Sequence, residues 1–547
     1  MLTIPTTQPR AASASTNPCG YWTGDPGAIR FGDAELTALI HQSDQPIFIV
    51  DVDGQIGATN SGAATLGGDA DKTAHPVLAY VPPVAADQLG DASFRDEMGV
   101  RFAYVSGAMA NGIASERLVI AMARAGMMGF FGAAGLSPQR VEQAIQTIQS
   151  EVGDLPYGFN LIHSPDDAAL ESAVVDLYLK YGVRCVSAAA FLGLTLPLVR
   201  YRLSGISRDE HGTVITPNRV VAKVSRVEVA KRFLAPPPDD MLAKLVANGD
   251  ITEAQAQMAR EIPVASDITA EADSGGHTDN RPALALLPTM LALRDTMQSQ
   301  FGYRQALRVG AAGGIATPSS VAAALAMGAS YVLTGSINQA CIESGTCDLV
   351  RKMLADASQA DVIMAPAADM FEMGVQVQVL KRGTMFAMRA KKLYEWYRAY
   401  PSLDELPAAH RQSLERDYLR CTIDEAWQST SAYFASRDPA QIQKAERDPK
   451  HKMALVFRSY LGQSSNWANS GDASRQADFQ VWCGPSMGAF NEWVRGTELE
   501  KPENRDAVTV AKNLLNGATV LTRANMLRAQ GVAVPAEATQ YKPRLVV

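Results

Sequence analysis

The feature that most constrains the fold of this chain is a regular alternation that begins near residue 100. Short apolar runs of β-prone residues alternate with stretches of helical periodicity, and eight such pairs fill roughly 240 residues. Strands that read as continuous apolar runs are buried on both faces, as in parallel sheets. The alternation therefore predicts a (β/α)8 barrel, with a doubly wound sheet as the main alternative. The strands are expected at residues 102–106, 127–131, 157–162, 185–188, 220–224, 264–270, 307–311 and 331–334.

Segments outside this pattern divide the chain into three regions. Residues 1–99 are expected to form a flexible tail and a small α/β section, and residues 100–345 are expected to form the barrel. Between about residues 234 and 263, three prolines precede two helical patterns, which predicts a helical insertion. Residues 346–547 are typical of a mainly helical region. The predicted fold class is therefore α/β, a TIM barrel with a helical insertion and a C-terminal helical appendage.

The overall composition argues against several classes of protein. A formal net charge of −7 disfavours general nucleic-acid binding, which usually needs a basic face. The N-terminal stretch lacks the apolar core of a signal peptide, and the apolar stretch 118–136 is interrupted by Arg124 and several glycines, which argues against a membrane span. The six cysteines form no CxxC pair, so we expect neither a metal site nor a disulfide framework. The cytoplasm is the expected location, and the oligomeric state stays open, a homodimer included.

The most informative motif is the stretch 309–336, which is typical of a strand, a glycine-rich turn, a helix and a second strand. Gly313 and Gly314 follow the seventh expected strand, and Gly335 and Ser336 follow the eighth. Small residues at two neighbouring strand ends expose backbone N–H groups at the carboxyl rim, where many barrels bind phosphate. We therefore expect these four residues to hold a phosphate. The alternative is that Gly313 and Gly314 only make a tight turn.

A second motif, EADSGGHTDNRP at residues 271–282, follows the sixth expected strand. Gly275 and Gly276 let the chain approach a ligand closely, and His277 then projects at the rim where barrel enzymes place their active sites. Histidine donates or accepts a proton near neutral pH, so we expect His277 to be catalytic. The alternative is a structural histidine, which its place at the end of a barrel strand disfavours.

Two further strand ends carry small or amide side chains. Gly107, Ala108 and Met109 follow the first strand, where a turn of small residues suits a flat ring that lies against the chain. Asn160 ends the third strand, and its side-chain amide can bond the polar edge of such a ring. His163 lies nearby and is expected to be structural. The rim is thus predicted to hold a planar cofactor that carries a phosphate.

These four stretches together resemble the FMN-dependent barrel family that contains nitronate monooxygenases and flavin enoyl-acyl carrier protein reductases. The turn at 107–109, the Gly-Gly-His at 275–277, the Gly-Gly-Ile at 313–315 and the Gly-Ser at 335–336 each look like the family's motif at that strand end. The resemblance covers about residues 100–345. It implies an FMN cofactor and NADH or NADPH as hydride donor. The implied FMN-binding residues are Gly107, Ala108, Met109, Asn160, Gly275, Gly276, Gly313, Gly314, Gly335 and Ser336.

A closer resemblance covers almost the whole chain and is to the PfaD-type proteins, the stand-alone, trans-acting enoyl reductases of polyunsaturated fatty acid and polyketide synthases. The insertion, the motif at 271–282 and the run VWCGPSMGAFNEWV at 481–494 carry this resemblance. It implies reduction of a 2-enoyl thioester on an acyl carrier protein, with His277 as a positioning group or proton donor. Asp279 and Ala108 stand where the broader family often has glycine, which weighs against nitronate oxidation as the alternative. A non-catalytic synthase scaffold is a second alternative.

A basic stretch in this acidic chain indicates where such a partner docks. Residues 381–398, KRGTMFAMRAKKLYEWYR, combine basic and aromatic side chains, and acyl carrier proteins are usually acidic. The alternative is an amphipathic helix with a solvated basic face. The candidate docking residues are Lys381, Arg382, Arg389, Lys391, Lys392 and Arg398.

Overall fold

The computed structural model describes residues 18–67, 74–164, 168–435 and 438–545. The chain forms two compact units, one from Met1–Leu89, Pro318–Ala323 and Ala511–Val547, and the other from Gly90–Thr317 and Ala324–Val510. The sequence predicts that the flexible tail ends at about residue 19, and residues 1–17 of it lie outside the described residues. The division of the chain at residues 99 and 345 stays a prediction.

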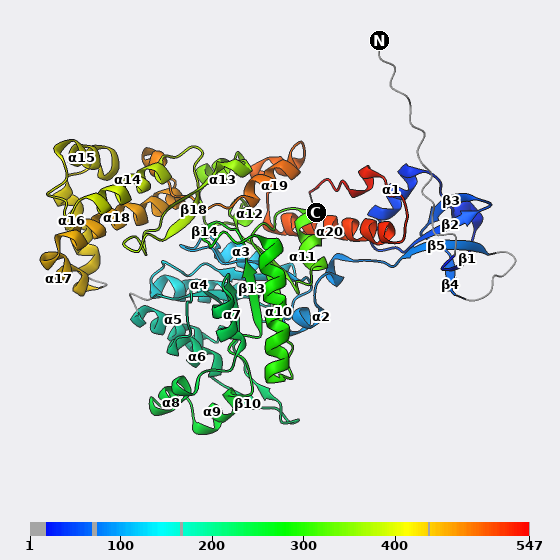
Figure 1. Cartoon of the computed structure of the whole chain (residues 1–547), viewed down its shortest axis with the longest axis horizontal. Coiled ribbons are helices and arrows are strands. Elements are labelled where there is room, and N and C mark those ends of the chain that lie inside the picture. Colours follow the sequence, from blue (N-terminus) through cyan, green and yellow to red (C-terminus); the bar gives the residue numbers. More distant parts are fainter. Residues whose placement is uncertain (1–17, 68–73, 165–167, 436–437, 546–547) are drawn as a thin grey trace, which may run out of the picture. The chain divides into compact units, whose positions relative to one another are not determined.

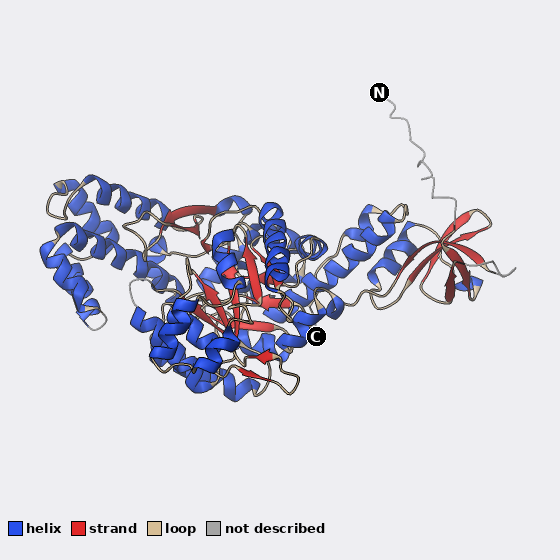
Figure 2. Cartoon of the chain, turned by 60° about the horizontal axis from the view of Figure 1, so that its bottom comes forward, coloured by secondary structure: helices blue, strands red, loops and turns tan. Residues whose placement is uncertain are grey.

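Eight parallel strands close into a barrel in the larger unit, and each lies close to its expected position. Every neighbouring pair in the ring is parallel and follows chain order, so the predicted (β/α)8 barrel is confirmed and the doubly wound sheet is wrong. Figure 2 shows these strands enclosed by helices. The strands are β6 (Tyr104–Ser106), β7 (Met128–Phe131), β8 (Gly158–Ile162), β9 (Cys185–Ala189), β12 (Arg219–Val224), β13 (Asp267–Glu271), β15 (Arg308–Ala312) and β16 (Val332–Thr334).

Three of the helices that follow these strands begin at a side-chain cap. The side chains of Ser115, Ser137 and Thr195 each accept a hydrogen bond from an N–H in the first turn of the helix that follows. Such caps satisfy N–H groups that have no partner within the helix. The helices are α3 (Glu116–Arg124), α4 (Pro138–Val152), α5 (Ala168–Tyr181), α6 (Leu196–Leu203), α7 (Val227–Leu234), α10 (Ala283–Phe301), α11 (Pro318–Ala326) and α12 (Ser336–Gln339).

Alternate residues of the strands fill the barrel interior, because side chains along a strand point to opposite faces. Phe94 of α2 (Ala92–Met98) stacks on Tyr331 at the amino end of the barrel, with ring centroids 4.2 Å apart. Tyr331 directly precedes β16, so the residue two positions further along that strand faces the interior nearer the carboxyl rim. The interior cluster contains Val105, Phe130, Cys185, Val221, Leu333 and, from α2, Phe94 and Met98.

The predicted helical insertion is present between β12 and β13. It consists of α8 (Asp239–Ala247) and α9 (Glu253–Ala259), and the hydroxyl of Thr252 accepts a hydrogen bond from the N–H of Gln255 at the start of α9. A short hairpin of β10 (Ser207–Arg208) and β11 (Val214–Ile215) precedes β12 and was not expected from the sequence. Its strands are too short to show an apolar alternation.

Beyond the barrel the larger unit continues with helices and two further strands. The strands β17 (Val362–Pro366) and β18 (Gln376–Leu380) form a small antiparallel sheet with β14 (Gly276–His277) in the order β14-β18-β17. Figure 1 shows α14, α15, α16, α17 and α18 gathered beyond this sheet. Among the described residues, no helix combines the length and apolar character that a bilayer crossing requires. The helices are α13 (Asp348–Ala355), α14 (Phe386–Ala399), α15 (Ala408–Ser413), α16 (Ile423–Ala435), α17 (Pro439–Arg447), α18 (Pro449–Ser470) and α19 (Ser486–Val494).

The smaller unit contains an antiparallel sheet in the order β3-β2-β5-β1-β4, against which α1 (Asp33–His41) and the C-terminal part of α20 (Ala507–Ala529) pack. Arg523 of α20 is fully buried, and its guanidinium donates to the carbonyl oxygens of Leu39, Ile40 and Gln45. Helical spacing at residues 34–40 and the β-prone apolar run at 46–50 predict this helix and the first part of β2. The strands are β1 (Gly20–Thr23), β2 (Ile47–Val52), β3 (Gln55–Thr59), β4 (Ala63–Leu66) and β5 (His75–Val81).

Candidate active site

The two turns predicted to hold a phosphate leave the barrel at the same edge. They follow β15 and β16, which are neighbouring strands in which Ala312 lies opposite Leu333. A side chain built on Gly314 or Gly335 would meet no atom within 4 Å, so the surface in front of both residues is open. Among the described residues, none accepts a hydrogen bond from the N–H of Gly314 or of Gly335. Open backbone N–H groups at adjacent strand ends are what a phosphate needs.

The turn at 107–109 borders the second of these phosphate turns. The N–H of Gly107 donates to the carbonyl oxygen of Thr334 at 2.9 Å, directly before Gly335 and Ser336. Ala108 packs against the interior cluster of the barrel, and the carbonyl oxygen of Met109 accepts from the N–H of Ala114 at 3.1 Å. The structure therefore brings these three residues beside the turn at 335–336, as their predicted common role requires.

His277 lies on a loop that is paired outside the barrel. Gly276 and His277 form β14, whose partners in β18 are Gln378 and Val377. The imidazole Nε2 of His277 lies 3.2 Å from Oδ1 of Asp369, and the His277 side chain is 40% exposed. His277 is thus held through both its backbone and its side chain, while the side chain stays partly exposed to solvent.

The loop before His277 is held by close backbone packing. A side chain on Gly275 would lie 2.9 Å from the backbone of Cys483 and of Gly484, so only glycine fits at this crossing. The N–H of Gly484 in turn donates to the hydroxyl of Ser336 at 3.1 Å. Gln378, which is buried, donates to the carbonyl oxygen of Ser274 at 2.7 Å. The segment at 483–484 therefore links the His277 loop to the turn after β16.

Asn160 faces the barrel interior and is 6% exposed. Its side-chain nitrogen donates to the carbonyl oxygen of Ser187 in the neighbouring strand at 3.1 Å. The side-chain nitrogen is thus hydrogen-bonded within the barrel wall. A contact between Asn160 and a cofactor ring stays a prediction, and the side-chain oxygen would have to make it.

Two charged residues of the barrel interior were missed by the sequence reasoning. Lys223 lies two positions beyond Val221, which belongs to the interior cluster, and its Nζ is 2.7 Å from Oε1 of Glu271. The hydroxyl of Ser274 donates to the same carboxylate oxygen at 3.1 Å. The side chains of Lys223 and Glu271 are largely buried, at 26% and 15% exposure respectively. The signal that could have found them is a lysine that follows the apolar run Val-Val-Ala within the strand RVVAKV.

Asp279, which departs from the family's glycine, anchors the far side of the His277 loop. Arg226 grips its carboxylate through Nε and Nη2, each at 3.0 Å, and the hydroxyl of Ser225 donates to Oδ2 at 2.5 Å. These bonds, those of Arg226 foremost, outweigh partial burial and lower the pKa of Asp279 to about 2. The residue therefore ties the loop after β13 to the end of β12.

Replacing Asp279 with asparagine is expected to lower the free energy of unfolding by about 1 kcal/mol at pH 7, a figure reduced for the exposure of Arg226. Because the folded-state pKa lies below the ordinary value of 3.8, the carboxylate stabilises the fold above about pH 4, and this stabilisation is lost as the pH falls towards 2. Thermal unfolding of both proteins between pH 7 and pH 3 measures the difference. It should shrink by about half at pH 3, and a difference that is constant with pH would contradict the assignment.

The remaining candidates have partners of their own. His163 bonds the buried carboxylate of Glu171 at 3.1 Å and stacks on Phe191, as expected for a structural histidine. Arg389 of the docking stretch pairs with the fully buried Asp478, and Lys392 pairs with Glu395 at 3.1 Å. The docking stretch thus lies on α14 and in the segment directly before it.

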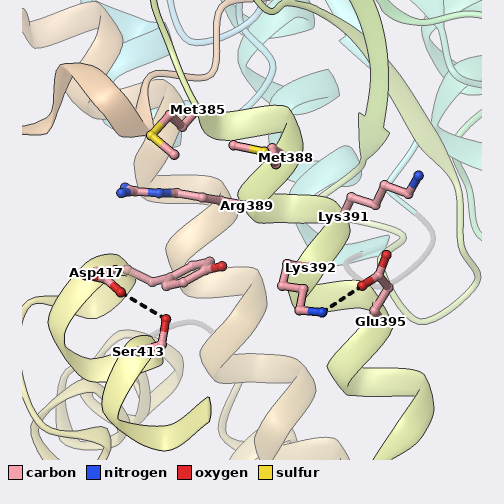
Figure 3. Close-up of a pocket in the computed structure, with 9 residues that line it drawn as sticks. Met385, Met388, Arg389, Lys391, Lys392, Glu395, Ser413 and Asp417 are labelled. Carbon is pink, nitrogen blue, oxygen red and sulfur yellow. Dashed lines mark hydrogen bonds and ion pairs between the residues drawn. The ribbon is translucent and has the colours of Figure 1, made fainter. Parts of the chain in front are cut away.

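A surface cavity of about 530 Å³ lies beside α14 (Figure 3). Figure 3 shows Lys391 and Lys392 projecting from α14, while Asp417 bonds Ser413 on the facing segment. This cavity is lined by Met385, Met388, Arg389, Lys391, Lys392, Glu395, Ser413, Asp417 and Tyr418. None of the predicted cofactor-binding residues lines it, so the chemistry is assigned to the barrel rim and not to this cavity.

The residues of the rim fit a phosphate-bearing flavin. The turns after β15 and β16 offer open backbone N–H groups for a phosphate, and the turn at 107–109 offers a wall of small residues. Lys223 and Glu271 add a buried ion pair in the barrel interior. The fold and these loops define the class of the protein: a (β/α)8 barrel with its candidate site at the carboxyl rim.

Comparison with known proteins identifies the family. A family model described as nitronate monooxygenase matches residues 96–393, and one described as the N-terminal domain of fatty acid synthase subunit PfaD matches residues 22–83. The crystal structure of the enoyl reductase domain of MlnA, from the macrolactin cluster of Bacillus amyloliquefaciens, is 41% identical, with a TM-score of 0.78, covering 81% of this chain and all of that one. The chain belongs to the nitronate monooxygenase family, in its PfaD-type branch of enoyl reductases. The resemblance predicted from the sequence is thereby confirmed.

Two curated relatives are larger proteins. A polyunsaturated fatty acid synthase subunit from Thraustochytrium is 49% identical over 82% of this chain, and the polyketide biosynthesis protein PksE of Bacillus subtilis is 46% identical over 81%. The chain spans 30% and 58% of their respective lengths. A third family model, described as the inserted helical domain of [acyl-carrier-protein] S-malonyltransferase, matches residues 400–479.

Proposed function

We propose that this chain is an FMN-dependent enoyl reductase that uses NADH or NADPH and acts in trans on 2-enoyl thioesters carried by an acyl carrier protein. Its family places it among oxidoreductases and favours a flavin cofactor. The observation that carries the proposal is the position of His277, which lies on a loop linked through Gly484 to the turn after β16. In this proposal His277 is the proton-transferring group, and the turns after β15 and β16 hold the flavin phosphate.

Each group of the rim has a defined task in this reaction. Bound there, FMN supplies the transfer of a hydride from the nicotinamide to the β-carbon of the enoyl thioester. The backbone N–H groups of Gly314 and Gly335 would bind the phosphate. His277 gives a proton to the α-carbon, which completes the saturated thioester.

The experiment that tests the proposal begins with the absorbance spectrum of the purified protein. A bound flavin should be bleached by NADH or NADPH without oxygen, and addition of a crotonyl thioester should then restore the oxidised spectrum and yield the butyryl thioester. A reduced flavin that does not react with the thioester would reject enoyl reduction. A colourless preparation that also refuses added FMN would instead favour the non-catalytic scaffold.

The match to a family model described as nitronate monooxygenase favours one competing activity, nitronate oxidation on the same barrel. The same preparation distinguishes the two activities, because a nitronate monooxygenase consumes oxygen with a nitroalkane and needs no enoyl acceptor. Oxygen uptake that depends on nitroalkane, without crotonyl reduction, would replace the present proposal.

The carrier protein is proposed to dock on the docking face, defined as Met388, Lys391 and Lys392 of α14. Met388 is 62% exposed, and both lysines are exposed beside the cavity of Figure 3. The opposite side of that cavity belongs to residues 400–479, the segment matched by the helical domain of a carrier-protein-dependent transferase. Exposed cations and an apolar side chain suit an acidic protein surface.

Reversing Lys391 and Lys392 to glutamate is expected to raise KM for a carrier-bound crotonyl thioester roughly tenfold at low salt, because it replaces attraction by repulsion. The effect should weaken at high salt, and kcat should stay unchanged. Lys180 and Lys244 are exposed lysines paired with carboxylates elsewhere, so their reversal is the matched control. An equal rise in KM with the control, or with a crotonyl thioester that lacks the carrier, would remove the docking face from the proposal.

A further inference from the structure

We propose that Asp369 is the positioning residue that fixes the imidazole of His277 through Nε2 and leaves Nδ1 as the atom that delivers the proton. This inference rests on the proposed function, since it assigns a task within that reaction. Asp369 lies outside the barrel, in the segment between β17 and β18. It is 92 residues from His277 in the sequence.

The backbone on both sides of this contact is held. His277 is fixed in β14 by pairing with Val377 of β18, and β18 pairs in turn with β17, which ends at Pro366. Asp369 follows β17 three residues later, and its Oδ1 also accepts the N–H of Met370 at 3.1 Å. Because β14 is paired, the imidazole of His277 can move only by rotation about its own side-chain bonds. The hydrogen bond to Asp369 restricts this rotation.

The protonation state of the pair follows from its chemistry. Partial desolvation opposes ionisation of Asp369, but its hydrogen bond to His277 and the charge of that ring prevail and lower the pKa of Asp369. An ionised carboxylate can only accept hydrogen bonds, so Nε2 of His277 must carry the hydrogen. The tautomer is thereby set, and the lone pair of the neutral ring resides on Nδ1.

The other carboxylates around the loop are engaged elsewhere. Asp279 is gripped by Arg226 and Ser225, and Asp273 accepts hydrogen bonds from Asn280 and Gln378. Among the described residues, Asp369 is the carboxylate that bonds His277. The orientation of the ring therefore depends on a segment beyond the barrel.

The proton step balances with this assignment. Addition of hydride at the β-carbon leaves an electron pair at the α-carbon, conjugated with the thioester carbonyl. The doubly protonated imidazole breaks its Nδ1–H bond, and the electron pair at the α-carbon forms the new C–H bond. The ring returns to the Nε2–H tautomer that Asp369 favours, and Nδ1 is reprotonated from solvent, to which the side chain is 40% exposed.

The test compares Asp369→Ala with Glu372→Gln in the full chain. Glu372 lies on the same segment but pairs with Arg458 at 3.2 Å, so its change removes a carboxylate without touching His277. We expect Asp369→Ala to slow reoxidation of the reduced enzyme by a crotonyl thioester on the order of tenfold, with FMN content unchanged. Glu372→Gln should leave that rate unaltered. In a His277→Ala background, Asp369→Ala should have no further effect.

A second readout does not depend on activity. Nitrogen-15 NMR of histidine-labelled protein, with the His277 signals assigned by their loss in His277→Ala, should show the Nε2–H tautomer in the parent chain and a mixture in Asp369→Ala. An unchanged tautomer and rate in Asp369→Ala, or an equal effect of that change without His277, would overturn the inference. Failure of the parent chain to reduce crotonyl thioesters would reject the proposed function, and the tautomer measurement would still decide whether Asp369 orients His277.

Discussion

Replacing His277 with alanine is expected to lower the turnover of a crotonyl thioester by about 100- to 10,000-fold while FMN stays bound. Its side chain is proposed to supply the proton, and within the described part of the chain its hydrogen-bond partner is Asp369 and not the phosphate turns, whereas its backbone in β14 is retained by alanine. Steady-state kinetics together with the flavin absorbance of the purified variant measure both quantities.

The control for this change is His163→Ala. His163 is also near the rim, but it bonds Glu171 and stacks on Phe191, so its loss should affect stability and not the chemical step. Full turnover of His277→Ala with a normal flavin content would show that the proton comes from elsewhere. Equal losses in both variants would show that the effect is a general disturbance of the rim.

Replacing Gly314 with alanine is expected to weaken FMN binding roughly tenfold to a hundredfold, so that the variant is purified largely without flavin. The added methyl group would project into the open space in front of the turn, where the phosphate is expected to lie. Loss of a single hydrogen bond between an N–H and a charged group costs about 1.5–3 kcal/mol, which corresponds to this range. Titration of the flavin-free protein with FMN, followed by fluorescence, gives the dissociation constant.

Gly249 provides a matched control because it shares the local geometry of Gly314. Both have φ of +77°, and a Cβ on either would meet no atom within 4 Å, but Gly249 lies in the helical insertion. The backbone strain of an alanine should therefore lower the melting temperature equally in the two variants. If Gly314→Ala bound FMN as tightly as Gly249→Ala, the phosphate could not lie at this turn.

The sequence predicted all of the barrel strands because each one depends on local information. A continuous apolar run between two helical patterns is visible within a few residues, and the strand ends then follow from chain order. Gly313, Gly314, Gly335 and Ser336 could be placed together for the same reason, since consecutive strands of a barrel are neighbours. The small sheet of the N-terminal section was only partly predicted, because its short strands pair across gaps in the chain.

The surroundings of His277 could not be predicted in this way. The pairing of β14 with β18 joins residues about a hundred positions apart, and β14 has only two residues, too few to show any pattern. The approach of Gly275 to Gly484 spans twice that distance along the chain. A sequence periodicity describes one element and carries no information on which distant segment will cover it.

The amino-acid sequence by itself determined the barrel, the order of its strands and the rim on which the glycine turns and His277 lie. These features depend on the periodicity of apolar residues and on the position of small residues, and both can be recognised within a short stretch of sequence. Only the tertiary structure decided that Asp369 bonds Nε2 of His277, that Lys223 meets Glu271 inside the barrel and that Asp279 is held by Arg226. Each of these pairs joins two strand ends or loops that the chain visits at different times. The contacts of Lys223 and Asp279 form only when the closed barrel brings their strand ends together, and the contact of Asp369 forms only when β14 pairs with β18.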